Sequence, residues 1–125
     1  MPIIVLVALG SAVGGIARWM LASKLDTHCP TAAIPWLGTL TVNVVGCFAI
    51  GMIASLVPAE RADLRALVMT GVLGGFTTFS AFSLQTASLL TAGRFRDVAI
   101  VVGASLVGCV IGTIAGAALG HRLSG

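Results

Sequence analysis

The stretch GGFTTFSAFS, residues 74–83, interrupts the third of four long apolar segments in this chain. It holds two glycines, two threonines and two serines in ten residues, a composition that favours neither a continuous helix nor contact with lipid. Non-helical backbone is tolerated at membrane depth only where protein or a water-filled cavity surrounds it. We therefore expect the third segment to be a helix that breaks near residues 74–78, close to a polar site.

The composition predicts a membrane protein. The chain has 125 residues, of which 58% are hydrophobic and 9% are charged, and its mean hydropathy is +1.10. A soluble domain carries about 25% charged residues, and a membrane-spanning helix needs roughly 20 apolar residues. The expected fold is an all-α membrane protein with a single four-helix transmembrane domain over residues 1–125. The helices are expected at about residues 3–21, 36–56, 66–90 and 98–119.

The basic residues favour neither orientation in the membrane. With four crossings, three of them fall on each side: Arg61, Arg65 and Arg122 against Lys24, Arg94 and Arg96. Because Lys and Arg in short loops normally hold a loop in the cytoplasm, this balance predicts insertion in both orientations and pairing as an antiparallel, dual-topology homodimer. Alternatively, a small imbalance from Arg18 or the amino terminus selects one orientation.

Glycines recur every four residues along one face of the last segment, at Gly108, Gly112, Gly116 and Gly120. Small residues at this spacing let helix backbones approach closely in a membrane. The pattern indicates tight packing, either inside one chain or between two chains, and does not by itself indicate a pore.

The charged residues argue against several classes of function. The acidic residues all fall in predicted loops or at helix ends, whereas a proton-coupled exporter usually keeps a carboxylate at mid-membrane. No HExxH, GxSxG or Ser/His/Asp grouping is present, so no enzyme is expected. Scattered charges without a basic cluster predict no nucleic-acid partner. The adjacent His28 and Cys29 lack further ligands and favour a plain loop over a metal site.

Neutral donors remain at membrane depth. The amide of Asn43 needs hydrogen-bond partners there. Phe79 and Phe82, three residues apart, share a helix face after the break, and aromatic ring edges carry partial positive charge. Together with the free amides at the start of a half-helix, these groups could solvate a small anion, while the carbonyls that end the first half-helix suit a cation. A structural hydrogen bond between helices is the alternative for Asn43, and ordinary core packing is the alternative for the two phenylalanines.

Three segments resemble the Fluc (CrcB) family of fluoride channels: GSAVGGIARWM at 10–20, GTLTVNVVGCFAIG at 38–51 and GVLGGFTTFSAFSLQT at 71–86. The resemblance covers nearly the whole chain. It implies a homodimer with two antiparallel pores that passively conducts fluoride out of the cytoplasm, as a multi-pass protein of the plasma (inner) membrane.

The resemblance also implies roles for particular residues. By position, the fluoride pathway would be lined by Asn43, Phe79, Phe82, Ser80, Thr78, Ser105 and Arg18. Backbone carbonyls of Gly74 and Thr77, from both subunits, would bind one structural sodium ion at the dimer centre. Two positions depart from the family pattern: Ala81 replaces a frequent threonine and Gln85 a frequent glutamate, which removes a hydroxyl and a carboxylate.

Two other classes of protein fit the sequence less well. A small dual-topology multidrug exporter should carry a glutamate inside its first helix, and this chain has Arg18 there instead. A non-transporting membrane subunit would suit the glycine spacing but leaves the interruption of the third segment unexplained.

Overall fold

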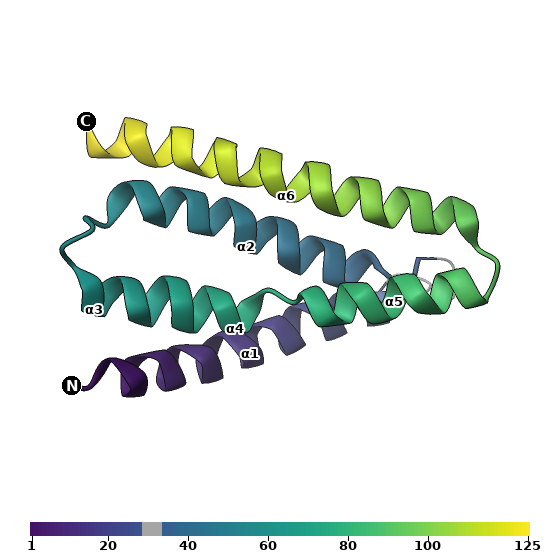
Figure 1. Cartoon of the computed structure of the whole chain (residues 1–125), viewed down its shortest axis with the longest axis horizontal. Coiled ribbons are helices and arrows are strands. Elements are labelled where there is room, and N and C mark those ends of the chain that lie inside the picture. The colour runs from purple at the N-terminus through teal and green to yellow at the C-terminus, as the bar shows by residue number, and fades with distance from the viewer. Residues whose placement is uncertain (29–33) are drawn as a thin grey trace.

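The computed structural model describes residues 1–28 and 34–125, and the regular structure in these ranges is helical. The elements in chain order are α1 (Ile3–His28), α2 (Leu37–Leu56), α3 (Ala62–Arg65), η1 (Ala66–Leu73), α4 (Gly74–Phe76), α5 (Phe79–Thr91) and α6 (Phe95–Ser124). Elements α3 to α5 together form the third crossing. The crossings lie side by side along the long axis, and both termini lie at the same end (Figure 1).

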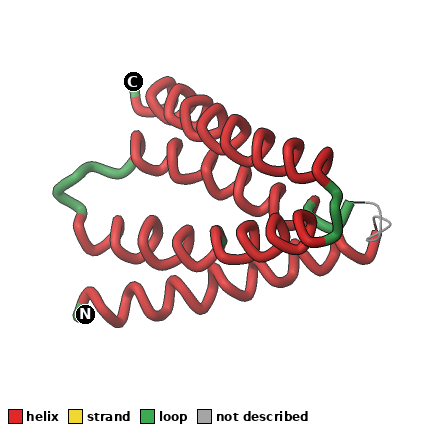
Figure 2. The backbone as a smooth tube through the Cα atoms, turned by 45° about the vertical axis from the view of Figure 1, so that its right-hand side comes forward, coloured by secondary structure: helices red, strands yellow, loops and turns green. Residues whose placement is uncertain are grey.

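Four segments are long and apolar enough to cross a membrane: Ile3–Leu25, Leu37–Leu56, Ala62–Thr91 and Phe95–Ser124. The all-α fold with four candidate membrane spans is thereby confirmed. Green loops join the red helices at the two ends of the bundle (Figure 2).

The helices α1, α5 and α6 extend beyond the residues expected from hydropathy. Asp97 belongs to the first turn of α6, where its carboxylate accepts a hydrogen bond from Arg94 Nε at 2.7 Å. A carboxylate is favourable at the positive end of a helix. Hydropathy marks the lipid-facing part of a helix, and the polar residues that follow continue the same helix without changing its backbone.

The third crossing is interrupted at Thr77 and Thr78. Both residues have extended backbone, with φ −82° and ψ 155° at Thr77 and φ −149° and ψ 112° at Thr78. The turns before them, in η1, are π-helical, a geometry that often accompanies functional sites. After the break, Thr78 Oγ1 accepts a hydrogen bond from Ala81 N at 3.2 Å and caps α5. The interruption occupies the last two residues of the range 74–78 and is visible between α4 and α5 in Figure 1.

Glycines pack α6 directly onto α2 within one chain. A Cβ built on Gly116 would collide with the backbone oxygen of Phe48, and one on Gly120 would lie 2.7 Å from Met52 O. Gly112 also faces the α2 backbone, 3.2 Å from Val44 O. The glycine spacing could serve packing inside one chain or between two chains, and these three glycines pack inside one chain.

A second close contact joins α1 to the first half of the third crossing. A Cβ on Gly14 would collide with Val72 O, and one on Gly10 would collide with Leu67 O. The chain is thus built from two glycine-packed pairs, α2 with α6 and α1 with η1.

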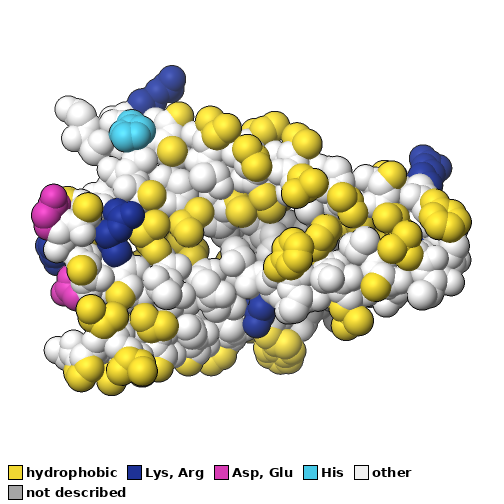
Figure 3. Space-filling view, viewed as in Figure 1, with side chains coloured by type: hydrophobic (Ala, Val, Ile, Leu, Met, Phe, Trp, Pro, Cys, Tyr) yellow, Lys and Arg dark blue, Asp and Glu magenta, His cyan; other side chains and the backbone are white. Residues whose placement is uncertain are grey.

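The outer surface is apolar over most of its length. Large hydrophobic side chains are exposed on every long helix, among them Ile16, Val45, Leu84 and Ile114. Figure 3 shows hydrophobic side chains spread along the visible face, with charged side chains gathered mainly at the two ends. A surface of this kind is suited to lipid or to a second chain.

Candidate functional site

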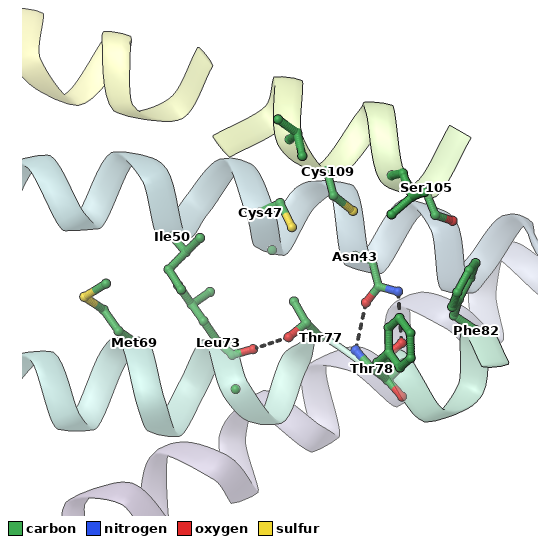
Figure 4. Close-up of a pocket in the computed structure, with 15 residues that line it drawn as sticks. Asn43, Cys47, Ile50, Met69, Leu73, Thr77, Thr78, Phe82, Ser105 and Cys109 are labelled. Carbon is green, nitrogen blue, oxygen red and sulfur yellow. Dashed lines mark hydrogen bonds between the residues drawn. The ribbon is translucent and has the colours of Figure 1, made fainter. Parts of the chain in front are cut away.

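A cavity of about 380 Å³ lies beside the interruption of the third crossing. Its walls come from α2, the residues around the break, α5 and α6, and Figure 4 shows the labelled side chains around it. The polar side chains on the walls are Asn43, Cys47, Thr77, Thr78, Ser105 and Cys109. Among the residues that the structure describes, no charged side chain lines this cavity.

Asn43 and Thr78 are joined by two hydrogen bonds across the cavity wall. Asn43 Nδ2 donates to Thr78 O at 3.0 Å, and Thr78 N donates to Asn43 Oδ1 at 2.7 Å. Because the Thr78 amide is a donor only, this pairing fixes which atom of the Asn43 amide faces it. Asn43 therefore makes the interhelical bond considered above and also lies on the cavity wall. The second N–H of its side chain is not used by this pair.

The same pairing opens the end of the first half-helix. Thr78 N donates to Asn43 Oδ1 and so does not close a turn on the carbonyl of Gly74, four residues before it. Thr77 N and Thr77 Oγ1 both donate to Leu73 O, each at 3.0 Å. Thr77 O accepts a hydrogen bond from Arg18 Nη1 at 3.4 Å, which brings a cationic group to the negative end of the half-helix.

The surroundings of Gly74 and Thr77 are compatible with a cation bound through backbone carbonyls. Gly74 is exposed, and a Cβ built on it would meet only Met69 O, at 3.9 Å, whereas one on Gly75 would meet the backbone of Ser11 at 2.5 Å. Thr77 O already accepts from a cationic side chain. Two carbonyls are fewer than the ligands that a hard cation takes, so a site here needs further oxygens, such as those of a second chain.

Three buried side-chain polar atoms have no hydrogen-bond partner among the described residues, and of these only Ser105 Oγ, on α6, lies on the cavity wall; the others are Trp36 Nε1 and Gln85 Oε1. Ser105 is 9% exposed and lines the cavity, and its hydroxyl has no hydrogen-bond partner within residues 1–28 and 34–125. By contrast, Thr113 on the same helix donates to Cys109 O at 3.0 Å. A buried hydroxyl without a partner costs about 1–3 kcal/mol. Its position on the cavity wall makes the Ser105 hydroxyl a candidate contact for a ligand.

Phe79 and Phe82 stand together on α5. Their ring centroids are 5.3 Å apart and the ring planes are inclined by 48°. Both side chains line the cavity, yet the Phe79 side chain is 76% exposed. Leu106 and Val110, on the α6 wall, are also exposed. One side of the cavity is thus open in the single chain.

The remaining predicted path residues lie in a second cavity, of about 490 Å³, which is lined by Arg18, Thr78 and Ser80 among others. Thr78 Oγ1 and Ser80 Oγ are 3.2 Å apart. The seven predicted residues therefore divide into two groups. Asn43, Phe79, Phe82 and Ser105 line the first cavity, Arg18 and Ser80 line the second, and Thr78 borders both.

The two departures from the family pattern have different surroundings. Ala81 lines the second cavity. Gln85 lies outside the lining of both cavities, and its Nε2 donates to Pro35 O at 3.3 Å, which ties α5 to the segment before α2. The hypothesis of a metal site at His28 and Cys29 stays untested, because Cys29 lies outside the described residues.

The sequence analysis does not single out the two cysteines of the cavity wall, Cys47 and Cys109. A signal was present, because Cys47 follows Asn43 by four residues and Cys109 follows Ser105 by four. Residues at this spacing share a helix face, so each cysteine falls beside a polar residue of the site.

Four apolar helices, a third crossing broken in its interior and a neutral, donor-bearing cavity at the break define the class: a multi-pass membrane protein with a polar cavity beside a discontinuous helix. In such proteins, non-helical backbone at depth surrounds the bound ion or substrate.

Comparison with known proteins identifies the family. Residues 5–117 match the model of the family described as CrcB-like protein, Camphor Resistance (CrcB). The chain belongs to this family.

Its relatives include proteins named fluoride-specific ion channel FluC. The one from Rhizobium johnstonii is 42% identical over 96% of this chain and 97% of the relative. The one from Rhodospirillum centenum is 45% identical over 95% of each, and the one from Opitutus terrae is 46% identical over 89% of this chain and 86% of the relative. The family is thus one of ion channels, which confirms the prediction that the chain is not an enzyme.

Proposed function

We propose that this protein is a fluoride-selective channel that exports fluoride passively from the cytoplasm. The main support for this proposal is the buried, unpaired hydroxyl of Ser105, which lies in a cavity that is also lined by the amide of Asn43 and the ring of Phe82. Relatives named as fluoride-specific channels, matched over almost their full length, support the choice of ion.

The wall chemistry suits fluoride better than other anions. Fluoride is small and strongly hydrated, so a pore must replace its water with closely spaced donors. Ser105 O–H, the free N–H of Asn43 and the ring edges of the phenylalanines are donors of this kind. None carries a full charge, so the ion is bound weakly enough to leave again. Chloride is larger and gains less from short contacts with such donors.

The second cavity supplies the other part of the path. Thr78 borders both cavities, and Ser80 continues the row of hydroxyls towards Arg18. A single positive charge at the mouth of a neutral path attracts anions without holding them inside it. Arg18 in this role raises the local concentration of fluoride.

A second copy of the chain completes the pore. The Phe79 side chain, 76% exposed, and the neighbouring Leu106 and Val110 border the open side of the cavity. An antiparallel partner covering this side would give two equivalent pores per homodimer. The equal numbers of basic residues on the two sides favour insertion of the chain into the plasma (inner) membrane in both orientations.

A structural sodium ion at the dimer centre fits the carbonyl groups at the break. Gly74 O and Thr77 O would hold it together with the same atoms of the partner subunit. A bound sodium ion would supply a fixed positive charge that draws the four carbonyls together. Arg18 already donates to Thr77 O, which supports the affinity of this carbonyl for cationic groups.

The test compares Ser105→Ala with Ser88→Ala in liposomes loaded with fluoride. Both variants lose one serine hydroxyl, but that of Ser88 is exposed and donates to Leu84 O at 2.9 Å. We expect Ser105→Ala to lower the fluoride efflux rate by at least about tenfold, the effect of one lost hydrogen bond to a charged group, and Ser88→Ala to leave it unchanged. Equal rates in both variants would remove the cavity from the fluoride path.

A further inference from the structure

Two thiols from different helices meet in the wall of the cavity. Cys47 belongs to α2 and Cys109 to α6, and both side chains lie on the wall of the same cavity. Both residues are half-buried and both line the cavity. Figure 4 shows the two sulfur atoms on the facing sides of the two helices. The fluoride path proposed above uses neither thiol.

The backbone holds this pair in place. A Cβ on Gly112, one turn after Cys109, would lie 3.2 Å from Val44 O, and a Cβ on Gly116 would collide with Phe48 O. On α2, a Cβ on Gly51 would collide with Thr113 O. Because the two helices touch through their backbones around the pair, the thiols are preorganised as ligands.

We propose that Cys47 and Cys109 form a two-sulfur binding site for a soft monovalent metal ion such as Cu⁺. Thiolate sulfur selects soft ions of this kind over hard ones. No group of three or more His, Cys, Asp or Glu side chains occurs in the part of the chain that the structure describes. The pair therefore lacks the four ligands of a structural zinc site, whereas a soft d¹⁰ ion is satisfied by two sulfurs in line.

Binding exchanges protons for the metal ion and changes no oxidation state. One Cu⁺ and two thiols give a bis-thiolate complex of net charge −1, and two protons pass to water. Metal affinity therefore rises with pH. With two protons released, the apparent binding constant increases by up to about 100-fold per pH unit while both thiols remain protonated in the free protein.

The complex would also act on the anion path, a consequence that rests on the proposed function. Cys47 follows Asn43 by one helical turn and Cys109 follows Ser105 by one turn, so the new negative charge would lie roughly 6 Å from each donor. A negative charge at this distance repels an entering anion. Bound Cu⁺ should therefore lower fluoride efflux by at least about tenfold.

The experiment titrates purified protein with Cu⁺ under oxygen-free conditions against a chromophoric Cu⁺ chelator. All samples carry Cys29→Ser, so that Cys47 and Cys109 are the remaining thiols of the three in the chain. We expect one Cu⁺ per chain, with affinity that rises with pH as above.

Removal of either ligand should abolish tight binding. Loss of a partner group outside the ligand shell typically reduces metal affinity 10–100-fold, so loss of one of two ligands should reduce it by about 100-fold or more. Cys47→Ala and Cys109→Ala test this with side chains that suit an apolar wall. Cys109→Ser combined with Val107→Cys is the matched control, because it keeps the number of thiols and moves one to an exposed position on the same helix.

The outcomes separate this inference from the proposed function. The metal site would be overturned if Cu⁺ binding survived in Cys47→Ala or in the variant with the relocated thiol. It would also be overturned if the intact pair bound no Cu⁺ at any pH. Cysteine-dependent binding without fluoride efflux in any sample would retain the metal site and remove the channel. Normal efflux that bound Cu⁺ does not lower would overturn its proposed effect on the anion path.

Discussion

Asn43 in α2 and Thr78 at the break of the third crossing satisfy each other's polar groups, with Thr78 N donating to Asn43 Oδ1 at 2.7 Å and Asn43 Nδ2 donating to Thr78 O at 3.0 Å. The side chain of one helix thus replaces the backbone partners that the interruption removes from another. The backbone N–H and C=O of Thr78 are therefore both paired although the helix is broken there. The second N–H of the Asn43 amide is not used by this pair and lies beside the cavity.

Replacement of Asn43 by leucine should destabilise the protein and abolish fluoride efflux. Leucine fills a similar volume but leaves Thr78 N and Thr78 O without these partners, at about 1–3 kcal/mol for each buried group. We expect a lower melting temperature in detergent. Thr41→Val is the control, because the Thr41 hydroxyl bonds only within its helix, to Leu37 O at 2.9 Å. Equal melting temperatures for the two variants would contradict this account of the break.

Replacement of either cavity phenylalanine by isoleucine should sharply reduce fluoride efflux and leave the dimer intact. Isoleucine keeps the apolar contact but has no ring edge with partial positive charge. Phe95→Ile is the matched control, since Phe95 is 68% exposed at the start of α6 and lines neither cavity. Efflux rates and gel-filtration profiles measure the two properties. Unchanged efflux in both Phe79→Ile and Phe82→Ile would show that the rings do not line the path.

Gly116→Ala should separate α6 from α2 and destabilise the fold. The added methyl group would collide with Phe48 O, and overpacking of this kind costs about 1–3 kcal/mol. Gly103→Ala is the internal control, because a Cβ at Gly103 meets nothing within 4 Å in the same helix. There alanine should be neutral or slightly stabilising, since it favours the helix. A comparable loss of thermal stability in both variants would refute direct backbone packing at Gly116.

A tag at the carboxyl terminus should be reachable from both sides of the membrane. Apart from Arg18, which lies within the first span, three basic residues are expected on each side, so neither orientation is favoured during insertion. Labelling with a membrane-impermeant reagent, before and after permeabilisation, measures the two populations. A tag that reacts from one side alone would exclude insertion in both orientations, and with it the antiparallel homodimer.

Much of the fold could be predicted from sequence because the lipid imposes it. Apolar segments of sufficient length must be helical in a bilayer, and residues 74–83 are too rich in Gly, Ser and Thr to continue one without interruption. The exact ends of the helices could not be predicted, since Asp97 and other polar residues outside the lipid extend a helix that hydropathy no longer marks. The role of Gly116 needed the structure, because the same spacing serves packing within or between chains.

The candidate site was only partly visible in the sequence. The chemistry of Asn43 and the phenylalanines pointed to an anion, but the division of the predicted path into two cavities depends on how α1 packs against η1 and α4, which no local pattern encodes. Arg18 donates to Thr77 O, a contact between residues far apart in sequence. The pairing of Cys47 with Cys109 likewise follows from the rotation of α2 against α6, which the backbone contacts of the glycines fix.

The most direct test of the central claim is the rate of fluoride efflux relative to chloride efflux from liposomes that contain the purified wild-type protein. Ion-selective electrodes report both rates on the same preparation, and protein-free liposomes give the background. If neutral donors at the helix break replace the hydration of a small anion, fluoride will leave rapidly and chloride at the background rate. Equal rates for the two halides, or no fluoride efflux above background, would contradict the account.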